Sequence, residues 1–464
     1  MTAAPLRVLA ELETRAWLVG GAVRDQMRGI ESADLDVVLD GRRVEQAARA
    51  LGRGAGGHVF QLSEGFGVWR VVAHDRSWQV DLIPLAGAGI EEDLGQRDFT
   101  INAVAEPVAG GAPVDPFGGL RDLAAGTIRM VAPDAFTRDP LRVMRLARIA
   151  AELGFEVDGA TLAAARASAA RLSGVAQERV FSELKRIIAS ERMLVGLELM
   201  DLTGATKIVL PEIADLRGVE QSRFHHLDVH DHTRAVLGEA AELERGPVHT
   251  LGEHAAAVRE LLAEPFANEL TRGQALRFGA LFHDAAKPQT RAVSDGGRIT
   301  FMGHDIAGAE LAAQALRRLR ASERLVEHVA ALTRHHLTLG FLVHRMPLSR
   351  RDIYRYLSEC APVQVDVTLL SIADRLATRG DNAEQAIERH LQLARQLLGE
   401  ALAWSARPPR PPLRGDELTR ELAGIHGPEV GRILAALKEA SWTGEIHDRS
   451  DALALARELH ERDG

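Results

Sequence analysis

Glycines and carboxylates near the N-terminus are spaced as a phosphate and cation site requires. The segment LVGGAVRD contains Gly20, Gly21 and Arg24, and Asp34 and Asp36 follow in the segment DLD. The pattern predicts a strand, a tight glycine turn, a short helix and a second strand. Residues two apart on a strand share a face, so Asp34 and Asp36 would project together, roughly 7 Å apart. A carboxylate pair suits Mg²⁺, which keeps its other positions for phosphate and water. The turn would admit a triphosphate, to which Arg24 offers a fork of donors.

Together and in this order, the two motifs resemble those of the nucleotidyltransferase superfamily that includes polymerase beta. More narrowly, they resemble the class II tRNA nucleotidyltransferases of bacteria and eukaryotes, which add CCA to tRNA 3′ ends, and the related bacterial poly(A) polymerases. Either motif alone is usually just a turn or a solvated strand edge, so the resemblance depends on their combination.

A third carboxylate, Asp81, lies in a run over residues 78–83 that predicts another strand. The resemblance implies that Asp81 joins Asp34 and Asp36 as a catalytic residue. In a two-metal transfer such a residue is a metal ligand and helps to activate the attacking 3′-hydroxyl. The alternative is an ordinary exposed aspartate on a strand.

The segment RDFTINAVA resembles the second motif of the same family, RRDFTINA. The resemblance implies that Arg97 faces the triphosphate, that Asp98 accepts hydrogen bonds from the ribose hydroxyls, and that Asn102 supports the same loop. Gln96 stands where many relatives have the first arginine. A third family stretch, DPFGGLRDL at residues 115–123, is predicted to close the head with a turn.

The segment RDPLRVMRLARIAAELG predicts a basic helix. Asp139 is a candidate N-cap, Pro140 suits the first helical position and Gly154 would end the helix. Three arginines at every third position share one face of the helix, namely Arg142, Arg145 and Arg148. A solvated basic face would explain them without any function.

The same segment resembles the nucleotide-selecting motif of the family, EDPLRxLRxxRFA. By that resemblance, Asp139 and Arg142 pair with the base edge of CTP or ATP, so that protein replaces a nucleic-acid template. Aspartate can accept from the exocyclic amino group that both bases share, and arginine can donate to ring acceptors. Arg145 and Arg148 would contact phosphates or tRNA. Arg138 replaces the usual glutamate of the motif.

Only about fifteen residues separate Asp81 from the RDFTINA segment. Many CCA-adding relatives have a longer, flexible segment here, which helps the site to switch from CTP to ATP, whereas relatives that add only the two cytidines have a short one. Alternatively, the segment is short only because loop length varies freely, with no effect on which nucleotides are added. The sequence therefore leaves open whether A is added after CC.

The second half of the chain is rich in histidine and contains, in order, an early histidine, an adjacent His-Asp pair, further histidines and a late aspartate, namely His232, His283–Asp284, His304, His335–His336 and Asp374. This ordered set resembles the HD phosphohydrolase superfamily. Imidazole and carboxylate ligands suit several divalent metals, which activate bound water and polarise phosphoryl groups. The alternative is a degenerate relic in which these residues only pack. The resemblance implies phosphodiesterase, nucleotidase or phosphatase chemistry on a metal of unknown identity. The expected ligands are His232, His283, Asp284, His304, His335 or His336, and Asp374.

Bulk properties set the broad class of the protein. Its 464 residues exceed a single core, and the 46% apolar content is ordinary for a soluble protein. Cys360 is the single cysteine, which excludes an internal disulfide framework and fits a reducing cytoplasm. Neither a signal peptide nor a membrane-length apolar run is evident, so we expect a cytoplasmic protein. The net charge of −9 means that any nucleic-acid surface must be local.

These observations predict an α+β protein: a small polymerase-beta-like head with a mixed sheet, followed by an all-helical neck, body and HD domain. The expected domains are a head over 1–125, a neck and body for nucleotide selection and tRNA binding over 126–220, an HD domain over 221–400 and a helical tail over 401–464. The expected function is CCA addition to tRNA from CTP and ATP with Mg²⁺, joined to an HD phosphohydrolase. Three alternatives stay open: a CC-adding enzyme, a poly(A) polymerase, and a metal-dependent phosphohydrolase with a tRNA-binding head.

Overall fold

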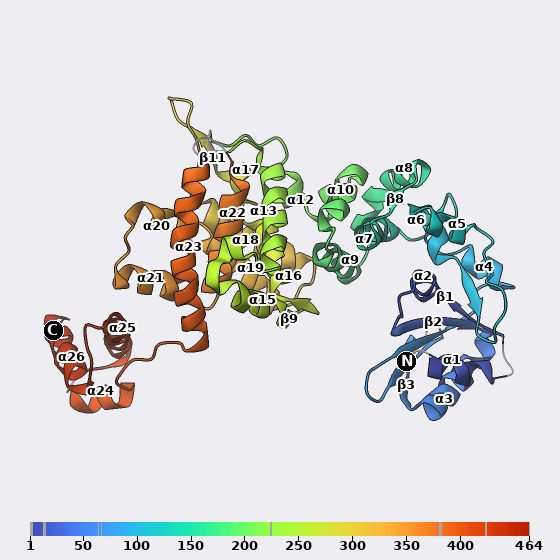
Figure 1. Cartoon of the computed structure of the whole chain (residues 1–464), viewed down its shortest axis with the longest axis horizontal. Coiled ribbons are helices and arrows are strands. Elements are labelled where there is room, and N and C mark those ends of the chain that lie inside the picture. Colours follow the sequence, from blue (N-terminus) through green and yellow to red (C-terminus); the bar gives the residue numbers. More distant parts are fainter. Residues whose placement is uncertain are drawn as a thin grey trace. The chain divides into compact units, whose positions relative to one another are not determined.

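The computed structural model of the chain describes residues 3–12, 15–63, 65, 67–222, 225–379, 383–422 and 425–463. The chain forms two compact units, residues 1–209 and 210–464 (Figure 1). The finer division into four domains stays a prediction.

The first unit is built on a six-stranded sheet in the order β3-β4-β5-β2-β1-β6. Strand β2 runs parallel to β5, and all other neighbouring strands are antiparallel, so the sheet is mixed, as predicted. The strands are β1 (Ala16–Val19), β2 (Asp34–Leu39), β3 (Gly57–Ser63), β4 (Val68–Ala73), β5 (Gln79–Pro84) and β6 (Ala105–Pro107).

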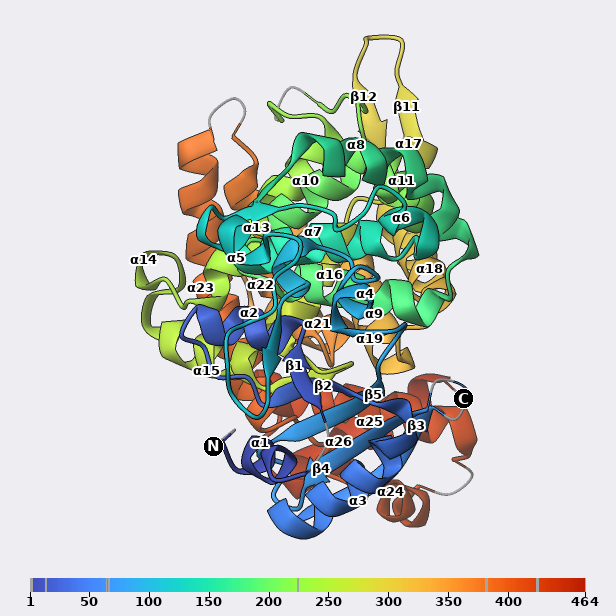
Figure 2. The same cartoon turned by 90° about the vertical axis from the view of Figure 1, so that its right-hand side faces the viewer.

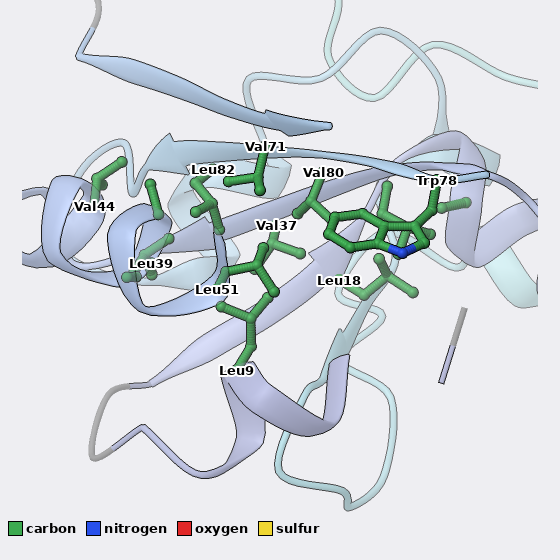
Figure 3. Packing of buried hydrophobic residues seen from close by; sticks show 14 of the residues in the cluster. Leu9, Leu18, Val37, Leu39, Val44, Leu51, Val71, Trp78, Val80 and Leu82 are labelled. Carbon is green, nitrogen blue, oxygen red and sulfur yellow. The ribbon is translucent and has the colours of Figure 1, made fainter. Parts of the chain in front are cut away.

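The alternation along β2 separates a buried face of the sheet from an acidic one. Leu35, Val37 and Leu39 are buried in a core against helices α1 (Ala3–Ala10) and α3 (Val44–Ala55), which cover this face (Figures 2 and 3). Residues of opposite parity, Asp34 and Asp36, therefore project from the other face. A strand sets both properties at once because its side chains alternate between faces.

The rest of the first unit is mainly helical. Helix α7 begins at Arg142 rather than at Pro140, and Asp139 stabilises the preceding turn by accepting from the Leu141 N–H (3.2 Å). The predicted end at Gly154, where φ is 70°, is observed. The helices are α2 (Gly21–Met27), α4 (Ile90–Leu94), α5 (Gly119–Ala124), α6 (Ala135–Arg138), α7 (Arg142–Leu153), α8 (Gly159–Ser168), α9 (Gln177–Ala189), α10 (Met193–Thr203) and α11 (Ala205–Val209), and strands β7 (Thr127–Ile128) and β8 (Glu156–Val157) pair in parallel.

The second unit is helical apart from two short antiparallel ribbons, β9 (Pro265–Ala267) with β10 (Leu270–Thr271) and β11 (Arg291–Val293) with β12 (Ile299–Phe301). No helix in the described residues is long and apolar enough to cross a membrane. The helices are α12 (Pro211–Ala214), α13 (Val229–Glu244), α14 (Val248–Leu251), α15 (Ala255–Ala263), α16 (Arg272–Phe282), α17 (Lys287–Thr290), α18 (His304–Arg318), α19 (Glu323–His335), α20 (Thr338–Leu342), α21 (Arg350–Cys360), α22 (Gln364–Ala377), α23 (Ala383–Ala406), α24 (Gly415–Glu421), α25 (Gly427–Thr443) and α26 (Arg449–Asp463).

Candidate active sites

The residues that the sequence singled out in the first unit converge on one polar cavity of about 510 Å³. Two of them, Asp34 and Asp36, come from β2, and the others come from α2, the segment around Asn102 and the neck helices. Asp81 is the exception, because it does not line the cavity. The predicted residues in the lining are Gly20, Gly21, Arg24, Asp34, Asp36, Arg97, Asp98, Asn102, Asp139, Arg142, Arg145 and Arg148.

Asp34 and Asp36, which line this cavity, have a third carboxylate beside them. Asp81 on β5 stands directly beside Asp36 on β2. Burial raises the pKa of Asp36 to about 6, the charges of Asp34 and Asp81 act in the same direction, and Arg97 opposes them. A site that disfavours its own negative charge in this way fits a divalent cation, which would offset the repulsion.

Asp81 has a partner that the sequence analysis did not identify. Both of its oxygens accept hydrogen bonds from the Arg70 guanidinium, at 2.6 Å from Nε and 2.7 Å from Nη2. The two residues are directly opposite in the antiparallel pair of β4 and β5. Pairing the two predicted strands in register would have indicated this contact, whereas their separation along the chain does not.

The glycine turn is as close to the site as predicted. Gly20 has a φ of 74°, which favours glycine, and a Cβ there would lie 3.0 Å from Arg97 Nη1 and 3.3 Å from Asp36 Oδ2. The absence of a side chain therefore keeps the space between the carboxylates and Arg97 clear.

A chain of hydrogen bonds joins the head to the neck through Asp98. Arg24 Nη1 donates to Asn102 (2.9 Å), Asn102 donates to Asp98 (3.0 Å), and Arg145 forms an ion pair with Asp98 (2.6 Å). Burial alone would raise the pKa of Asp98, but the charge of Arg145 and hydrogen bonds from Asn102 and the Phe99 N–H hold it below its usual range. Asp98 therefore stays ionised and able to accept hydrogen bonds.

Asp139 and Arg142, which are expected to bind the base edge of the nucleotide, form hydrogen bonds with other residues of the protein. Arg179 donates to Asp139 Oδ2 (2.9 Å), a contact that the sequence analysis missed. Arg142 donates to the backbone oxygens of Arg97 (3.0 Å) and Ala135 (3.2 Å). Both side chains therefore have fixed positions at the cavity wall.

Arg148 lines the cavity, but its guanidinium is paired with carboxylates of the neck helices. It donates to Glu183 (2.5 Å) and Glu152 (2.8 Å), and it is almost fully buried. This arrangement fits a structural role better than a phosphate contact.

The second unit brings most of the predicted metal ligands together around Asp284. One group consists of His232, His283 and Asp374, and another of Asp284, His304 and His336; within each group the ligand atoms lie within 4.8 Å of one another. His283 Nε2 is 3.2 Å from Asp284 Oδ2, and His304 Nε2 is 3.3 Å from Asp284 Oδ1. His232 Nε2 is 3.0 Å from Asp374 Oδ1.

The imidazoles are oriented as metal ligands usually are. The Nδ1 atoms of His283, His304 and His336 each lie within hydrogen-bond distance of the carbonyl three residues earlier, at 2.8, 2.6 and 2.6 Å. A carbonyl only accepts, so each Nδ1 carries a proton, and in the neutral ring each Nε2 has a lone pair directed at the cluster. His232 Nε2, His283 Nε2 and Asp284 Oδ2 are buried, and their close polar neighbours are ion-pair partners rather than well-directed hydrogen-bond partners. Such a donor set fits a divalent metal.

His335 is a correction to the predicted set. Its Nδ1 lies 4.0 Å from Glu359, outside the two groups, whereas the adjacent His336 is inside. Consecutive residues of a helix point about 100° apart, so only one of two adjacent histidines at the end of α19 can face the centre.

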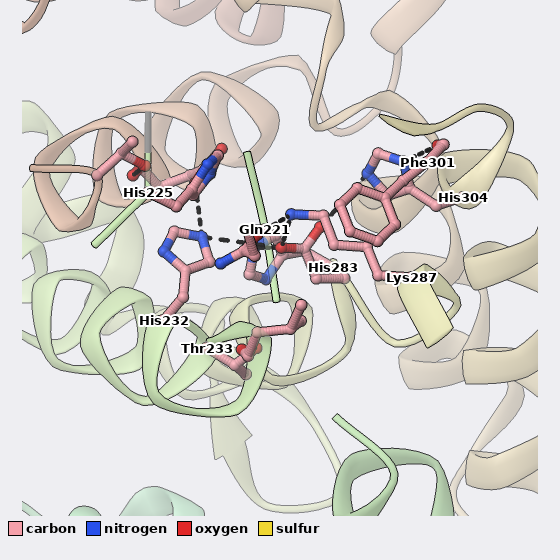
Figure 4. Close-up of polar contacts among 12 residues, drawn as sticks. Gln221, His225, His232, Thr233, His283, Lys287, Phe301 and His304 are labelled. Carbon is pink, nitrogen blue, oxygen red and sulfur yellow. Dashed lines mark hydrogen bonds and ion pairs between the residues drawn. The ribbon is translucent and has the colours of Figure 1, made fainter. Parts of the chain in front are cut away.

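Three polar residues beside this centre were not among the predicted ligands (Figure 4). Lys287 Nζ lies 2.6 Å from Asp284 Oδ2 and donates to Gln221 Oε1 (2.7 Å). The His225 ring contacts the His232 ring edge-on, with centroids 5.2 Å apart. Lys287 follows the His-Asp pair by three residues, a spacing of nearly one helical turn that could have indicated it.

Comparisons with known proteins agree with these two centres. Residues 16–129 match the family model described as "Poly A polymerase head domain", residues 154–216 match "Probable RNA and SrmB- binding site of polymerase A", and residues 251–379 match "HD domain". The first unit thus contains a nucleotidyltransferase head and the second an HD domain.

Curated relatives specify the family. The chain is 36% identical over 448 residues to the A-adding tRNA nucleotidyltransferase of Deinococcus radiodurans, covering 95% of both chains. It is 35% identical to the CC-adding tRNA nucleotidyltransferase of Thermus thermophilus, covering 95% of this chain and 92% of the relative. The chain therefore belongs to the tRNA nucleotidyltransferase family, and it is an enzyme of that class.

Solved structures agree on the fold. The Thermotoga maritima CCA-adding enzyme complexed with tRNA has a TM-score of 0.61 at 18% identity, covering 100% of this chain and 94% of that one. A CCA-adding enzyme with ATP has a TM-score of 0.64 at 18% identity, with the same coverage. The α+β head followed by helical domains is thereby confirmed.

Proposed function

We propose that the first unit extends the 3′ end of tRNA from CTP and ATP, building all or part of the terminal CCA. The tRNA 3′-oxygen bonds to the α-phosphorus of the nucleotide, the bond from that phosphorus to pyrophosphate breaks, and the 3′-hydroxyl loses its proton. The convergence of the motif residues on one cavity beside Asp34 and Asp36 supports this function most strongly. Because the proposed substrate is tRNA, we also propose that the enzyme acts in the cytoplasm.

Several groups around the cavity would take part in this reaction. Asp34 and Asp36, with Asp81 beside them, would hold Mg²⁺, which neutralises charge on the phosphates when bound. Arg24 and Arg97 are positioned to bind the triphosphate. Asp98, ionised and buried, would accept from the ribose hydroxyls. Asp139 and Arg142, fixed at the wall, would select the base by hydrogen bonds.

The loop before Arg97 favours a second candidate, an enzyme that stops after CC. Residues 85–96 are short and tied down: Asp93 accepts from the Ala86 N–H (3.2 Å) and from Arg97 (3.2 Å). Arg138 donates to the Gly95 carbonyl (3.0 Å) and thereby fastens the same loop to α6. A loop held at both ends has little freedom to rearrange between CTP and ATP.

Primer extension distinguishes these candidates. The protein is incubated with Mg²⁺ and tRNA ending at the discriminator base, with CTP alone, ATP alone or both, and products are resolved to single nucleotides. Addition of CC and then A would establish complete CCA addition, and a stop at CC would establish the specialised enzyme. Long A-tracts would point to a poly(A) polymerase. A parallel reaction gives ATP to tRNA that already ends in CC, because an enzyme that adds only A would extend this primer alone. No addition to either primer would contradict the proposal.

We also propose that the second unit is a metal-dependent phosphohydrolase. The two groups of clustered imidazole and carboxylate ligand atoms support a divalent metal there. The metal would activate water for attack on a phosphate ester. Metal analysis of purified protein, together with assays on 2′,3′-cyclic phosphates and nucleotides, tests this function. Asp284→Ala should remove both metal and hydrolysis while nucleotide addition persists, and bound metal unaffected by that change would contradict the proposal.

Mutations in one unit should remove its own activity, nucleotide addition or hydrolysis, and leave the other activity intact. Asp34→Ala combined with Asp36→Ala should abolish nucleotide addition and leave hydrolysis intact. Loss of both activities in this double variant would contradict two separate sites, and retention of nucleotide addition would contradict the roles proposed for Asp34 and Asp36.

A further inference from the structure

A row of side chains crosses the exposed face of the sheet next to the carboxylates. Asp36 on β2 is paired with Asp81 on β5, Asp81 with Arg70 on β4, and Arg70 with Phe60 on β3. Directly paired residues project from the same face of a sheet. Val71, of opposite parity, is buried in the core on the other face. The row therefore lies on the face that carries the active-site acids.

Arg70 keeps hydrogen-bonding capacity beyond its pair with Asp81. The ion pair uses N–H groups on Nε and Nη2, and a guanidinium has five such donors. No other described residue accepts a hydrogen bond from Arg70, and 27% of its side chain is exposed. A guanidinium fixed by a carboxylate and open to solvent is suited to bind a phosphate.

The next position of the row is apolar and exposed. Phe60 is 44% exposed, and Leu62 on the same strand is 48% exposed. Aromatic rings beside a basic residue are typical platforms for unpaired nucleic-acid bases. Neighbouring strands lie about 4.8 Å apart, so Arg70 and Phe60 follow Asp81 at about 5 and 10 Å along the sheet. Asp81, Arg70 and Phe60 therefore follow one another at intervals that suit the hydroxyl, phosphate and base at the end of an RNA strand.

We propose that Arg70 and Phe60 form the surface that receives the 3′-terminal nucleotides of the acceptor RNA. With the terminal hydroxyl at the carboxylates, Arg70 binds the backbone phosphate of the end and Phe60 stacks on an unpaired base. The assignment rests on the proposed function of the head. It also explains why Asp81 faces the row rather than the nucleotide cavity.

Binding and kinetics of two variants test this assignment. With tRNA ending at the discriminator base, Arg70→Met and Phe60→Ala should each raise the KM for tRNA about tenfold while the KM for CTP stays unchanged. Affinity for labelled tRNA is then measured without nucleotide between 50 and 200 mM salt. The slope of log affinity against log salt should become shallower by about 0.7 for Arg70→Met, because one phosphate contact is lost, and stay unchanged for Phe60→Ala.

Arg49→Met is the matched control. Arg49 is an exposed arginine of α3 in the same head, paired with Glu45, and its loss changes the net charge equally. Arg70→Lys keeps the positive charge, so its salt slope should equal that of the wild-type protein. It provides the test if Arg70→Met is poorly folded. If Arg70→Met and Phe60→Ala bound tRNA with the same affinity as Arg49→Met, the assignment would be overturned. Failure of the wild-type protein to extend both tRNA ending at the discriminator base and tRNA ending in CC would instead overturn the proposed function.

Discussion

Replacing Asp36 by asparagine should stabilise the metal-free protein at neutral pH, by an amount that grows between about pH 4 and 6 and is constant above that range. Burial and the neighbouring carboxylates raise the pKa of Asp36 from 3.8 to about 6 in the folded state. The folded chain therefore binds this proton more tightly than the unfolded chain does. Stability from the protonated group is present below about pH 4 and is lost as the pH rises through about 6. Asparagine does not ionise, so it escapes that loss.

The shift sets an upper limit on the effect. The pKa rises by about 2 units, and each unit corresponds to 1.36 kcal/mol, so the limit is about 3 kcal/mol at pH 7.5. In a unit of roughly 200 residues, 1 kcal/mol moves Tm by about 2–4 °C. The variant should therefore melt up to about 6–12 °C higher.

Calorimetry in EDTA at pH 4.5 and 7.5, followed by titration with Mg²⁺, measures this difference. Added Mg²⁺ should raise the Tm of the wild-type protein more than that of the variant, because the carboxylate is a proposed ligand. Asp75→Asn is the sign control: hydrogen bonds from Ser77 hold the pKa of Asp75 below its usual range, so its loss should not stabilise the protein at pH 7.5. An Asp36→Asn gain of equal size at both pH values, or none at either, would refute the reasoning.

Three further outcomes can be checked. Gly20→Ala should reduce nucleotide addition at least tenfold and raise the KM for CTP, because the new Cβ would meet Arg97 and a φ of 74° is unfavourable for alanine. Equal KM values for CTP in the variant and the wild-type protein would count against this. His336→Ala should lower the metal content of the second unit while His335→Ala should not, as measured by elemental analysis. Burial raises the pKa of the Cys360 thiol to about 12, so the native protein at pH 8 should resist a thiol reagent that reacts at once after unfolding.

Much of the first unit could be predicted because its signals are local. Alternation along β2 determines which face is buried and therefore where Asp34 and Asp36 project. The glycine turn follows from a conformation that few other residues adopt, as the φ of Gly20 shows. The fold class followed from these patterns together with the resemblance, and the comparisons confirm it.

What could not be predicted depends on contacts between elements. The partnership of Arg70 with Asp81 depends on strand register, and that of Arg179 with Asp139 depends on how α9 packs beside α7. Neither is encoded in a short motif. The choice of His336 rather than the adjacent His335 likewise depends on the rotation of a helix about its axis, which sequence order does not specify.

The hydrogen-bonded chain through Asp98 limits how this enzyme could exchange parts with others. Asp98 belongs to the segment between strands β5 and β6. Its counter-ion, Arg145, belongs to helix α7, beyond residue 125, where the sequence predicted a domain boundary. A head moved onto a foreign neck would keep a buried carboxylate without its counter-charge, which is strongly destabilising. Recombination would therefore preserve this site only if residues 1–209 moved as a block, so head and neck are expected to be inherited together.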